Sequence, residues 1–425
     1  MAYARRVRAK GLGEPNRNFW LGVYNGILVN GGEAFFHSAL VLAPFLAALG
    51  APTWAIGAIP ALRIGGWFLP QLFVASRLAH QPLKLPVYRR SSTVRVIAFA
   101  VLTAAVFLLG DRPTVLILVT LAVLGVNAVA GGVGGVPFAD VTAKVVPHYR
   151  LGTFWVLRNA IGGALALVSG VVLARVLDSD LDFPSDFGVV FLLGSVLLTG
   201  AYLAFAAVRE PAGKPALREP MRKMLRRLPS VLRTDRSFRR YLRVRFLALA
   251  AMMAEPFYAV YAIERLGAPT SALGSFVITA TFASILVNFA FRRPADRGRN
   301  VTVLQISIAM LAAAPLIAIV TPVWQGFALV FALSAAGTSG MGIAAWNLLY
   351  AVSPESQRPL YVGVANSVLA APSLAPIAVG GAIGLIGFAG AFGLAAVAAI
   401  AALAFAFRFH ELRELDRAAL EESAA

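Results

Sequence analysis

Twelve long apolar stretches divide this chain of 425 residues, and they constrain its fold more than any other feature. A helix needs about 20 mostly apolar residues to cross the hydrocarbon core of a membrane. Only 14% of the residues are charged, whereas soluble globular chains carry roughly 25%. The sequence therefore predicts an all-α polytopic membrane protein, with twelve transmembrane helices near 19–47, 54–76, 93–109, 115–138, 155–176, 187–207, 243–264, 271–290, 300–320, 325–349, 361–384 and 388–408.

Basic residues gather in alternate loops between these stretches. They occupy the N-terminal segment and the loops after the second and eighth stretches, whereas the loop after the fifth stretch is acidic. Loops rich in Lys and Arg stay on the cytoplasmic side of a membrane. We therefore expect both termini to be cytoplasmic, in an inner (plasma) membrane. This pattern also accounts for the net charge of +18, so no nucleic-acid partner is expected.

The sequence contains few of the residues and motifs that catalysis or metal binding requires. It has no cysteine and four scattered histidines, which excludes disulfides and argues against a metal site. No nucleophile–base set and no Gly-x-Ser-x-Gly motif is present, so we expect neither an enzyme nor a cofactor. The basic N-terminal segment has no apolar core with a cleavage site, which predicts a cytoplasmic tail rather than a signal peptide.

A repeated turn indicates two halves. The sequence LGAPTWAIG at 49–57 recurs as LGAPTSALG at 266–274, each time after the stretch that opens a half. Parallel six-helix halves with a solute site at their interface are a known transporter architecture. We expect an N-terminal tail at 1–18, a six-helix bundle at 19–208, a basic linker at 209–240, a second six-helix bundle at 241–408 and a C-terminal tail at 409–425.

The basic linker is predicted to lie on anionic lipid headgroups, since its arginines and lysines surround an amphipathic stretch. A specific acidic partner or a regulatory lipid is the alternative.

With twelve spans, a central basic loop and inside termini, the whole chain resembles the major facilitator superfamily. Asp296-Arg297-Gly298-Arg299 is similar to the core of the family's loop motif, whereas the first-half loop ASRLAHQPLKLPVYRR lacks the Asp-Arg pair. The segments VVPHYRLGTFWVLRN and VSPESQRPLYVGVAN are similar to the family's short turns after the fourth and tenth helices. The resemblance implies two pseudo-symmetric bundles, a monomer, transport of a small solute by alternating access, and a cytoplasmic latch at Asp296, Arg297 and Arg299.

Ionisable residues inside apolar spans are costly and usually face a cavity or a partner. Glu33 and His37 lie with Asn30 on one face of the first span, and Arg63 lies at a similar depth to His37 in the second. They predict a cluster that binds the solute or a proton. A fixed ion pair that locks the two helices is the alternative.

Three residues of the second half are further candidates for solute or proton contact. When the two repeats are aligned, Glu255 falls opposite position 38, beside His37. Its alternative role is to cap the backbone groups that Pro256 leaves without a hydrogen bond. Trp346 and Asn347 lie on the tenth span, which lines the cavity in the resembled family. Packing is the alternative for both.

A second set of charges lies at the inner ends of the fourth and fifth spans. Asp140, Lys144, Arg150 and Arg158 predict a cytoplasmic gate whose ion pairs break as the cavity opens, with pairing at the membrane interface as the alternative. The Gly-rich run at 131–135 lacks the lysine of a phosphate loop and predicts close helix contact.

The function expected from these features is secondary active transport, with proton coupling compatible with the embedded acids. Efflux of amphipathic compounds and uptake of polar ones both remain open. One alternative is a receptor or scaffold that has kept the fold, which the cost of burying Glu33, Arg63 and Glu255 argues against. Another is a flippase for a lipid or lipid-linked molecule.

Overall fold

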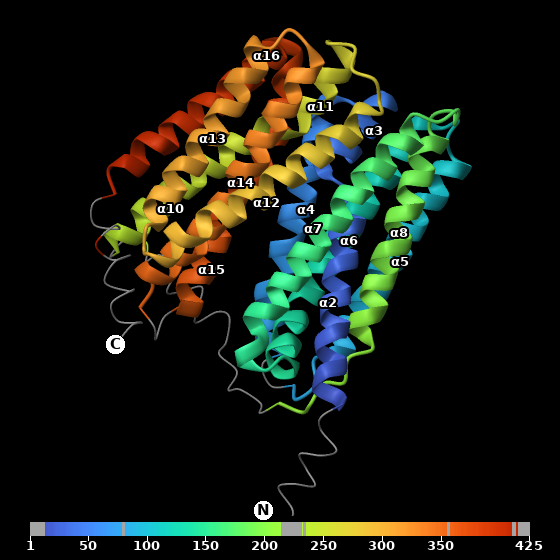
Figure 1. The fold of residues 1–425 in the computed structure, drawn as a ribbon. Helices are drawn as coiled ribbons and strands as arrows, with labels where there is room; N and C mark the ends of the chain where they lie inside the picture. Colours follow the sequence, from blue (N-terminus) through green and yellow to red (C-terminus); the bar gives the residue numbers. More distant parts are fainter. Residues whose placement is uncertain are drawn as a thin grey trace, which may run out of the picture. The chain divides into compact units, whose positions relative to one another are not determined.

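The chain folds into helices throughout the part that the structure describes. The computed structural model describes residues 13–78, 81–213, 232, 235–354, 358–409 and 414. The principal α-helices, labelled in Figure 1, are α2 (Gly13–Ala34), α3 (Ala43–Ala48), α4 (Thr53–Leu78), α5 (Leu85–Leu108), α6 (Pro113–Val145), α7 (Leu151–Leu177), α8 (Ser185–Ala206), α10 (Arg236–Ala250), α11 (Glu255–Glu264), α12 (Ala272–Asp296), α13 (Asn300–Val320), α14 (Phe327–Val352), α15 (Arg358–Leu369) and α16 (Ala375–Phe407).

Ten helical ranges of the described chain are long and apolar enough to cross a membrane. The helix α4 adds a further apolar helix of 26 residues. The last range, Tyr361–Phe407, has 47 residues and is interrupted at Gly387, whose φ of 68° favours glycine. This interruption falls between the predicted spans 361–384 and 388–408. The helices are therefore consistent with the twelve predicted spans.

Contacts divide the chain into two compact units. The first unit comprises Met1–Phe36 and Gly66–Pro220, and the second comprises His37–Gly65 and Met221–Ala425. The predicted bundles at 19–208 and 241–408 differ from these units, because the segment from His37 to Gly65 groups with the second half. In the first unit, α2 packs against α7 and α8, and α5 packs against α6 and α8 (Figure 1). In the second unit, α14 packs against α12 and α13, and α16 packs against α10 and α13.

Element boundaries also refine the predicted tails and linker. The helix α2 begins at Gly13, inside the predicted tail at 1–18, and residues 1–12 lie outside the described part. The helix α10 begins at Arg236, so the last residues of the predicted linker at 209–240 are helical. Most of the linker, and all of the predicted C-terminal tail except 409 and 414, lie outside the described residues.

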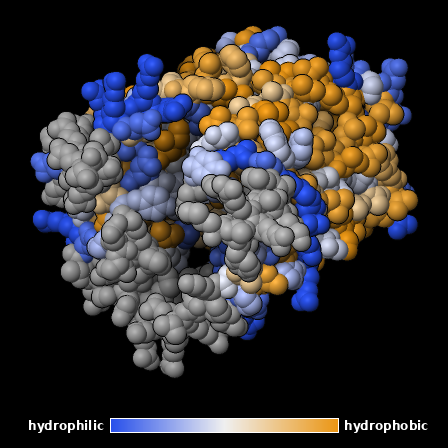
Figure 2. All heavy atoms as spheres, turned by 60° about the horizontal axis from the view of Figure 1, so that its bottom comes forward, coloured by the Kyte–Doolittle hydropathy of each residue, from blue (hydrophilic) through white to orange (hydrophobic). Residues whose placement is uncertain are grey.

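Side chains sort as expected for helices in lipid. Aromatic residues fill the core of the first unit, where the ring of Phe36 stacks on that of Phe191 at 5.2 Å. Large apolar side chains are exposed on helices of both units, including Leu108, Val320 and Leu385. Figure 2 shows hydrophobic side chains over a broad part of the surface and hydrophilic ones along its edges. Apolar surface of this kind is stable against hydrocarbon rather than water.

The first span of each half is broken at the same place in the repeat. After α2, His37 is extended (φ −60°, ψ 125°) and a π-helical turn follows at Ser38–Leu42. After α10, a 3₁₀ turn at Ala251–Ala254 precedes α11, which starts at Glu255. The break after α10 agrees with Pro256, which the sequence predicts to free backbone groups inside the span at 243–264, whereas the break inside the span at 19–47 was not predicted. Pro256 contributes to the second break, since it has no N–H to continue the helical bonding.

Within the second unit, α4 and α16 touch backbone to backbone. A Cβ added to Gly57 would meet the carbonyl group of Pro376, and a Cβ added to Gly380 would meet the carbonyl group of Thr53. The Thr53 hydroxyl donates a hydrogen bond to the Gly380 carbonyl oxygen. Small residues let helices approach this closely in membranes.

Candidate functional site

Polar side chains from three helices meet inside the first unit. Glu33 comes from α2, Arg95 from α5 and Asn127 from α6. A guanidinium nitrogen of Arg95 lies 3.8 Å from a carboxylate oxygen of Glu33 and donates to Asn127 Oδ1 at 3.4 Å. We call these three residues the polar cluster. An ion pair within membrane-spanning helices is expensive, and such pairs usually mark a functional path.

Aromatic rings and a glycine shape the space around Arg95. Its guanidinium carbon lies 4.5 Å from the centre of the Tyr202 ring, close enough for a cation–π interaction. A Cβ added to Gly131 of α6 would lie 2.9 Å from the Trp67 ring and 3.5 Å from the Arg95 guanidinium carbon. The Gly-rich run therefore lets neighbouring side chains approach the α6 backbone, which confirms the prediction of close helix contact.

Two donors of the polar cluster have no acceptor. The Nε of Arg95 and the Nδ2 of Asn127 are buried and make no hydrogen bond within the described residues. A buried donor without an acceptor costs about 1–3 kcal/mol. The side chain of Glu33 is 30% exposed and that of Arg95 is 17% exposed, so the cluster is not sealed. A polar molecule can reach the exposed parts of Glu33 and Arg95, and it can bond to the two buried donors only after a side chain moves.

The sequence identified Glu33 but missed its partner. Arg95 lies near the start of an apolar stretch. Glu33 was selected because a charge inside a span is costly, and the same reason applies to Arg95. Arg63, the predicted partner, belongs to the second unit, whereas Glu33 belongs to the first. The cluster of Glu33, His37 and Arg63 stays a prediction.

His37 and Asn30 make local contacts. The Nδ1 of His37 accepts a hydrogen bond from the backbone N–H of Leu40 at 3.3 Å, so this side chain caps the π-helical turn. Asn30 donates to the carbonyl oxygen of Gly26 at 2.8 Å. These bonds stabilise the broken first span. A role for either residue in solute contact stays a prediction.

Arg158 of α7 is also buried in the first unit, where it contacts groups outside the polar cluster. It donates from Nη1 to the Gly22 carbonyl oxygen and to Asn25 Oδ1, both at 2.8 Å. Its guanidinium carbon lies 5.0 Å from the centre of the Phe138 ring. A Cβ on Gly26 would overlap the Arg158 side chain, so a glycine is needed there. Carbonyl oxygens and aromatic rings, rather than a carboxylate, hold this cation within the described residues.

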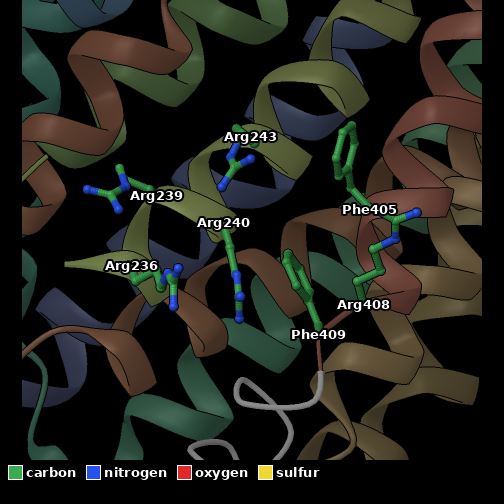
Figure 3. A pocket seen from close by; sticks show the side chains of 7 residues that line it. All are labelled: Arg236, Arg239, Arg240, Arg243, Phe405, Arg408 and Phe409. Atoms are coloured by element: carbon green, nitrogen blue, oxygen red, sulfur yellow. The ribbon is translucent and has the colours of Figure 1, made fainter. Parts of the chain in front are cut away.

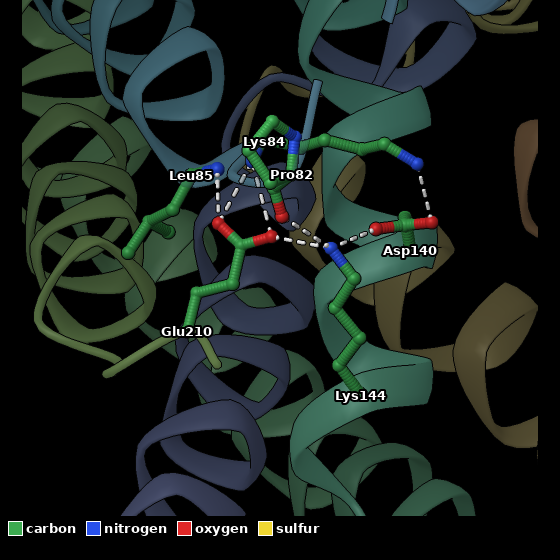
Figure 4. Close-up of polar contacts among 6 residues, drawn as sticks. All are labelled: Pro82, Lys84, Leu85, Asp140, Lys144 and Glu210. Carbon is green, nitrogen blue, oxygen red and sulfur yellow. Dashed lines mark hydrogen bonds and ion pairs between the residues drawn. The ribbon is translucent and has the colours of Figure 1, made fainter. Parts of the chain in front are cut away.

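A network of ion pairs joins the ends of several helices in the first unit (Figure 4). Asp140 lies 2.6 Å from the ammonium of Lys84 and 2.7 Å from that of Lys144. Glu210, whose side chain is only 2% exposed, lies 2.7 Å from Lys144. The Glu210 carboxylate also accepts the backbone N–H groups of Lys84 and Leu85 at 2.8 and 2.7 Å. It thereby satisfies two free donors where α5 begins.

The four residues of the predicted gate therefore do not share one network. Asp140 and Lys144 share this network, but Arg150 and Arg158 contact other groups. Arg150 donates to Asn16 Oδ1 at 2.7 Å and lies over the Phe19 ring at 3.9 Å. Glu210 was missed because the sequence places it at the start of a linker, where an acidic residue usually faces solvent. A gating role for Asp140 and Lys144 stays a prediction.

In the second unit, Glu255 is half-buried at the first position of α11. It makes no hydrogen bond or ion pair with any residue that the structure describes. The helix α11 packs against the π-helical turn and α3, which belong to the same unit. Glu255 thus stands next to a helix break, on a helix that packs against the segment that is its counterpart in the repeat.

The other predicted residues of the second unit are spread out. Asn347 donates to Asn300 Oδ1 at 2.8 Å, and Trp346 is 47% exposed. Asp296 lies 3.8 Å from Arg292, and both side chains are at least 70% exposed. Arg297 and Arg299 are exposed on either side of Gly298. Exposed pairs of this kind contribute little stability, and the latch stays a prediction.

Among the described residues, no group of three His, Cys, Asp or Glu side chains is arranged to hold a metal ion.

Similar folds occur in solved transporter structures. The nucleoside transporter NupG matches with a TM-score of 0.70 and 13% identity, over 92% of this chain and 99% of that one. A bacterial homologue of the iron transporter ferroportin matches with a TM-score of 0.68 and 13% identity, over 92% and 98%. A D-xylose–proton symporter matches with a TM-score of 0.66 and 12% identity, over 93% and 98%.

No protein-family model and no curated protein matches the sequence itself. At these identities the structural matches establish the fold. The chain has the all-α fold of major facilitator superfamily transporters.

Proposed function

We propose that this protein is a secondary active transporter that moves a small polar solute by alternating access, with the polar cluster as a solute contact. The observation that carries the proposal is the partly exposed Glu33–Arg95 pair, beside two buried donors of Arg95 and Asn127 that lack an acceptor among the described residues. The proteins with similar folds transport nucleosides, iron or D-xylose, which supports the class of function. Such folds expose a central site to one side of the membrane at a time.

The chemistry of the polar cluster favours a solute that accepts hydrogen bonds. An Arg guanidinium binds carboxylate or phosphate oxygens in a two-pronged geometry, and it binds hydroxyl or carbonyl oxygens singly. Because Glu33 already offsets the charge of Arg95, the solute need not be an anion. We therefore place hydroxylated or carbonyl-rich solutes ahead of apolar drugs.

We further propose that Glu33 and Glu255 couple transport to protons. Both carboxylates lie within membrane-spanning ranges, where a group that gains and loses a proton can link solute movement to a gradient. Inward-facing termini in an inner membrane remain part of the proposal and are supported by the basic loops.

The test of the solute site is uptake into proteoliposomes. Purified protein is screened against radiolabelled nucleosides, pentoses, peptides and organic acids. We expect Arg95→Gln to lower uptake of the transported solute at least tenfold, as losing a charged hydrogen bond predicts. Arg175→Gln, at an exposed arginine near the end of α7, is the matched control. Equal uptake by the two variants would exclude the polar cluster, and no uptake of any solute would reject transport.

The test of coupling repeats the assay with and without a pH gradient. We expect the gradient to stimulate uptake by the native protein but not by Glu33→Gln or Glu255→Gln. Glu264→Gln, an exposed glutamate of the same helix as Glu255, is the control and should keep the stimulation. Gradient-independent uptake by the native protein would reject proton coupling and leave the solute site untouched.

A further inference from the structure

One arginine of the second unit lies deep in a membrane-spanning range and makes no ion pair with any residue that the structure describes. Arg245 belongs to the range Arg236–Glu264, and at 1.5 Å per residue it lies roughly 14 Å from the start of that range. It is half-buried, and its Nε and Nη1 are buried without a hydrogen-bond partner. Arginine stays protonated in proteins, so Arg245 is a permanent charge within an apolar span, which is costly.

Arg245 is separate from the other arginines of α10. Four arginines nearer the start of this helix, Arg236, Arg239, Arg240 and Arg243, line a cavity of about 390 Å³ (Figure 3). Two residues along a helix turn the side chain by about 200°, so Arg245 points away from Arg243. It shares a helix face with Tyr241, one turn earlier, and Tyr241 is buried in the core of the unit. Arg245 is therefore directed toward neighbouring helices and not toward this cavity.

Two contacts define how α14 lies against this span. The Tyr241 hydroxyl donates to the Ala345 carbonyl oxygen at 3.0 Å, and the ring centres of Tyr258 and Phe331 lie 6.1 Å apart. The later residue of the span thus meets the earlier residue of α14, so the two run in opposite directions. Arg245, one turn after Tyr241, therefore lies opposite the part of α14 that comes one turn before Ala345.

That part of α14 carries a second polar group without a partner, next to an open space. Thr338 and Gly342 lie there, four residues apart and therefore on one face of the helix. The Oγ1 of Thr338 is buried and makes no hydrogen bond in the described part of the chain. A Cβ added to Gly342 would meet no heavy atom within 4 Å. A small polar group can therefore lie beside Gly342, opposite Arg245.

The elements around Arg245 bring no negative charge to it. The helix α10 packs against α14, α15 and α16, and none of these three helices contains Asp or Glu. The nearest acids in the sequence are Asp235 and Glu255, each ten residues away, which is about 15 Å along a helix. Tyr241 interacts with Arg245, but its hydroxyl is neutral. The charge is therefore available to an anion that the protein binds.

We propose that Arg245 and Thr338 bind a carboxylate group of the transported solute. A guanidinium can donate two parallel N–H bonds to the two oxygens of a carboxylate, and the Thr338 hydroxyl can donate a further bond. One fixed positive charge balances one negative charge, which favours a monocarboxylate over a phosphate group that carries nearly two. Because Nε and Nη1 are buried, the Arg245 side chain turns toward the space beside Gly342 when the solute binds.

This inference rests on the proposed transport function and narrows the class of solute. The polar cluster favours hydroxyl or carbonyl groups and needs no negative charge, because Glu33 offsets Arg95. Arg245 has no such carboxylate among the described residues. The expected solute is therefore a polar molecule that also carries one carboxylate.

The test compares carboxylates with their uncharged amides in the proteoliposome uptake assay. The pairs are lactate and lactamide, nicotinate and nicotinamide, and glucuronate and glucuronamide, with uptake by protein-free liposomes subtracted. We expect uptake of at least one acid to exceed that of its amide at least tenfold. Arg245→Gln should lower this acid-to-amide ratio at least tenfold, and Thr338→Val about threefold. Because both solutes of a pair enter through the same protein, the ratio does not depend on how much of a variant is folded.

Arg243→Gln is the matched control, since it removes the same charge from an exposed arginine of the same helix. It should leave the acid-to-amide ratio unchanged. An equal loss in both arginine variants would overturn the carboxylate site and leave transport intact, as would a native ratio near one in a protein that takes up other solutes. Glucose 6-phosphate is the phosphate probe, and faster uptake of it than of every carboxylate would overturn the choice of carboxylate. If no solute of any kind is taken up, the proposed transport function fails and this inference fails with it.

Discussion

In the first unit, Glu210 is buried between the Lys144 ammonium and two backbone N–H groups, and Glu33 lies 3.8 Å from Arg95. In the second unit, Glu255 stands at a helix break with no polar contact among the described residues. The two units have the same kind of helical bundle but hold these carboxylates differently. Glu33 and Glu210 have partners within the first unit, whereas Glu255 has none among the described residues.

Corresponding corners of the two units are each held by polar contacts between groups distant in the chain. Where α2 begins and α8 ends, Asn18 Nδ2 donates to the Arg209 carbonyl oxygen at 3.0 Å, and the Arg209 N–H donates back to Asn18 at 3.1 Å. Where α10 begins, Asp235 accepts the backbone N–H of Phe238 and the Tyr361 hydroxyl, each at 2.8 Å. Because arginines follow Asp235 on α10, we call this second place the basic corner.

The largest effect on stability is expected at Glu210. Glu210→Ala removes a buried carboxylate, leaves the N–H groups at the start of α5 without their acceptor, and leaves the Lys144 ammonium with Asp140 as its one remaining described carboxylate partner. Breaking a buried pair in this way costs about 3 kcal/mol. Thermal unfolding of the purified protein in detergent measures the loss. Asp296→Ala, which breaks an exposed pair, should change stability by less than about 1 kcal/mol. Similar losses for both variants would show that burial does not distinguish the pairs.

A smaller loss is expected at Asp235, the one acid at the basic corner with described polar contacts. Asp235→Ala removes the cap of α10 and leaves the Tyr361 hydroxyl without its acceptor. A helix cap and a hydrogen bond together contribute about 2 kcal/mol. The melting temperature should fall. Tyr361→Phe, which removes only the hydroxyl that donates to Asp235, should lower it by a smaller amount. If Asp235→Ala has the melting temperature of the native protein, the contacts of Asp235 do not stabilise the start of α10.

Glu255 should respond in the opposite direction to Glu210. Glu255→Gln removes a charge that has no described partner, so the cost of holding it among helices disappears. We expect stability to rise by up to about 1 kcal/mol, while Glu210→Gln should lower it. The two variants are compared in the same unfolding assay at neutral pH. A destabilised Glu255→Gln would indicate that this carboxylate is used structurally, which would remove the contrast between the units.

The apolar pattern of the sequence was enough to predict the helices and their approximate number, because a span in lipid depends mainly on composition and length. It also placed a break near Gly387. Pro256 marked the break after α10, whereas the break after α2 was not predictable in this way. It occurs inside a continuous apolar run and depends on how neighbouring helices satisfy the freed backbone groups.

Charges were harder to assign than spans. The high free-energy cost of an ionisable residue in an apolar stretch identified Glu33 and Glu255 as candidates. It does not identify the partner, because Arg95 lies on a helix distant in sequence and reaches Glu33 only through packing. Residues at span ends, such as Glu210 and Arg243, look solvated in the sequence whether they are buried in a network or line a cavity.

The contact between α4 and α16 has a consequence for how the gene can vary. Gly57 and Gly380 each leave room for a carbonyl group on the opposite helix, so a methyl group at either position separates the two backbones. The two codons are therefore constrained together although they are far apart in the gene. In a saturation mutagenesis library, nearly every change at either position should be depleted, and one substitution should not rescue the other.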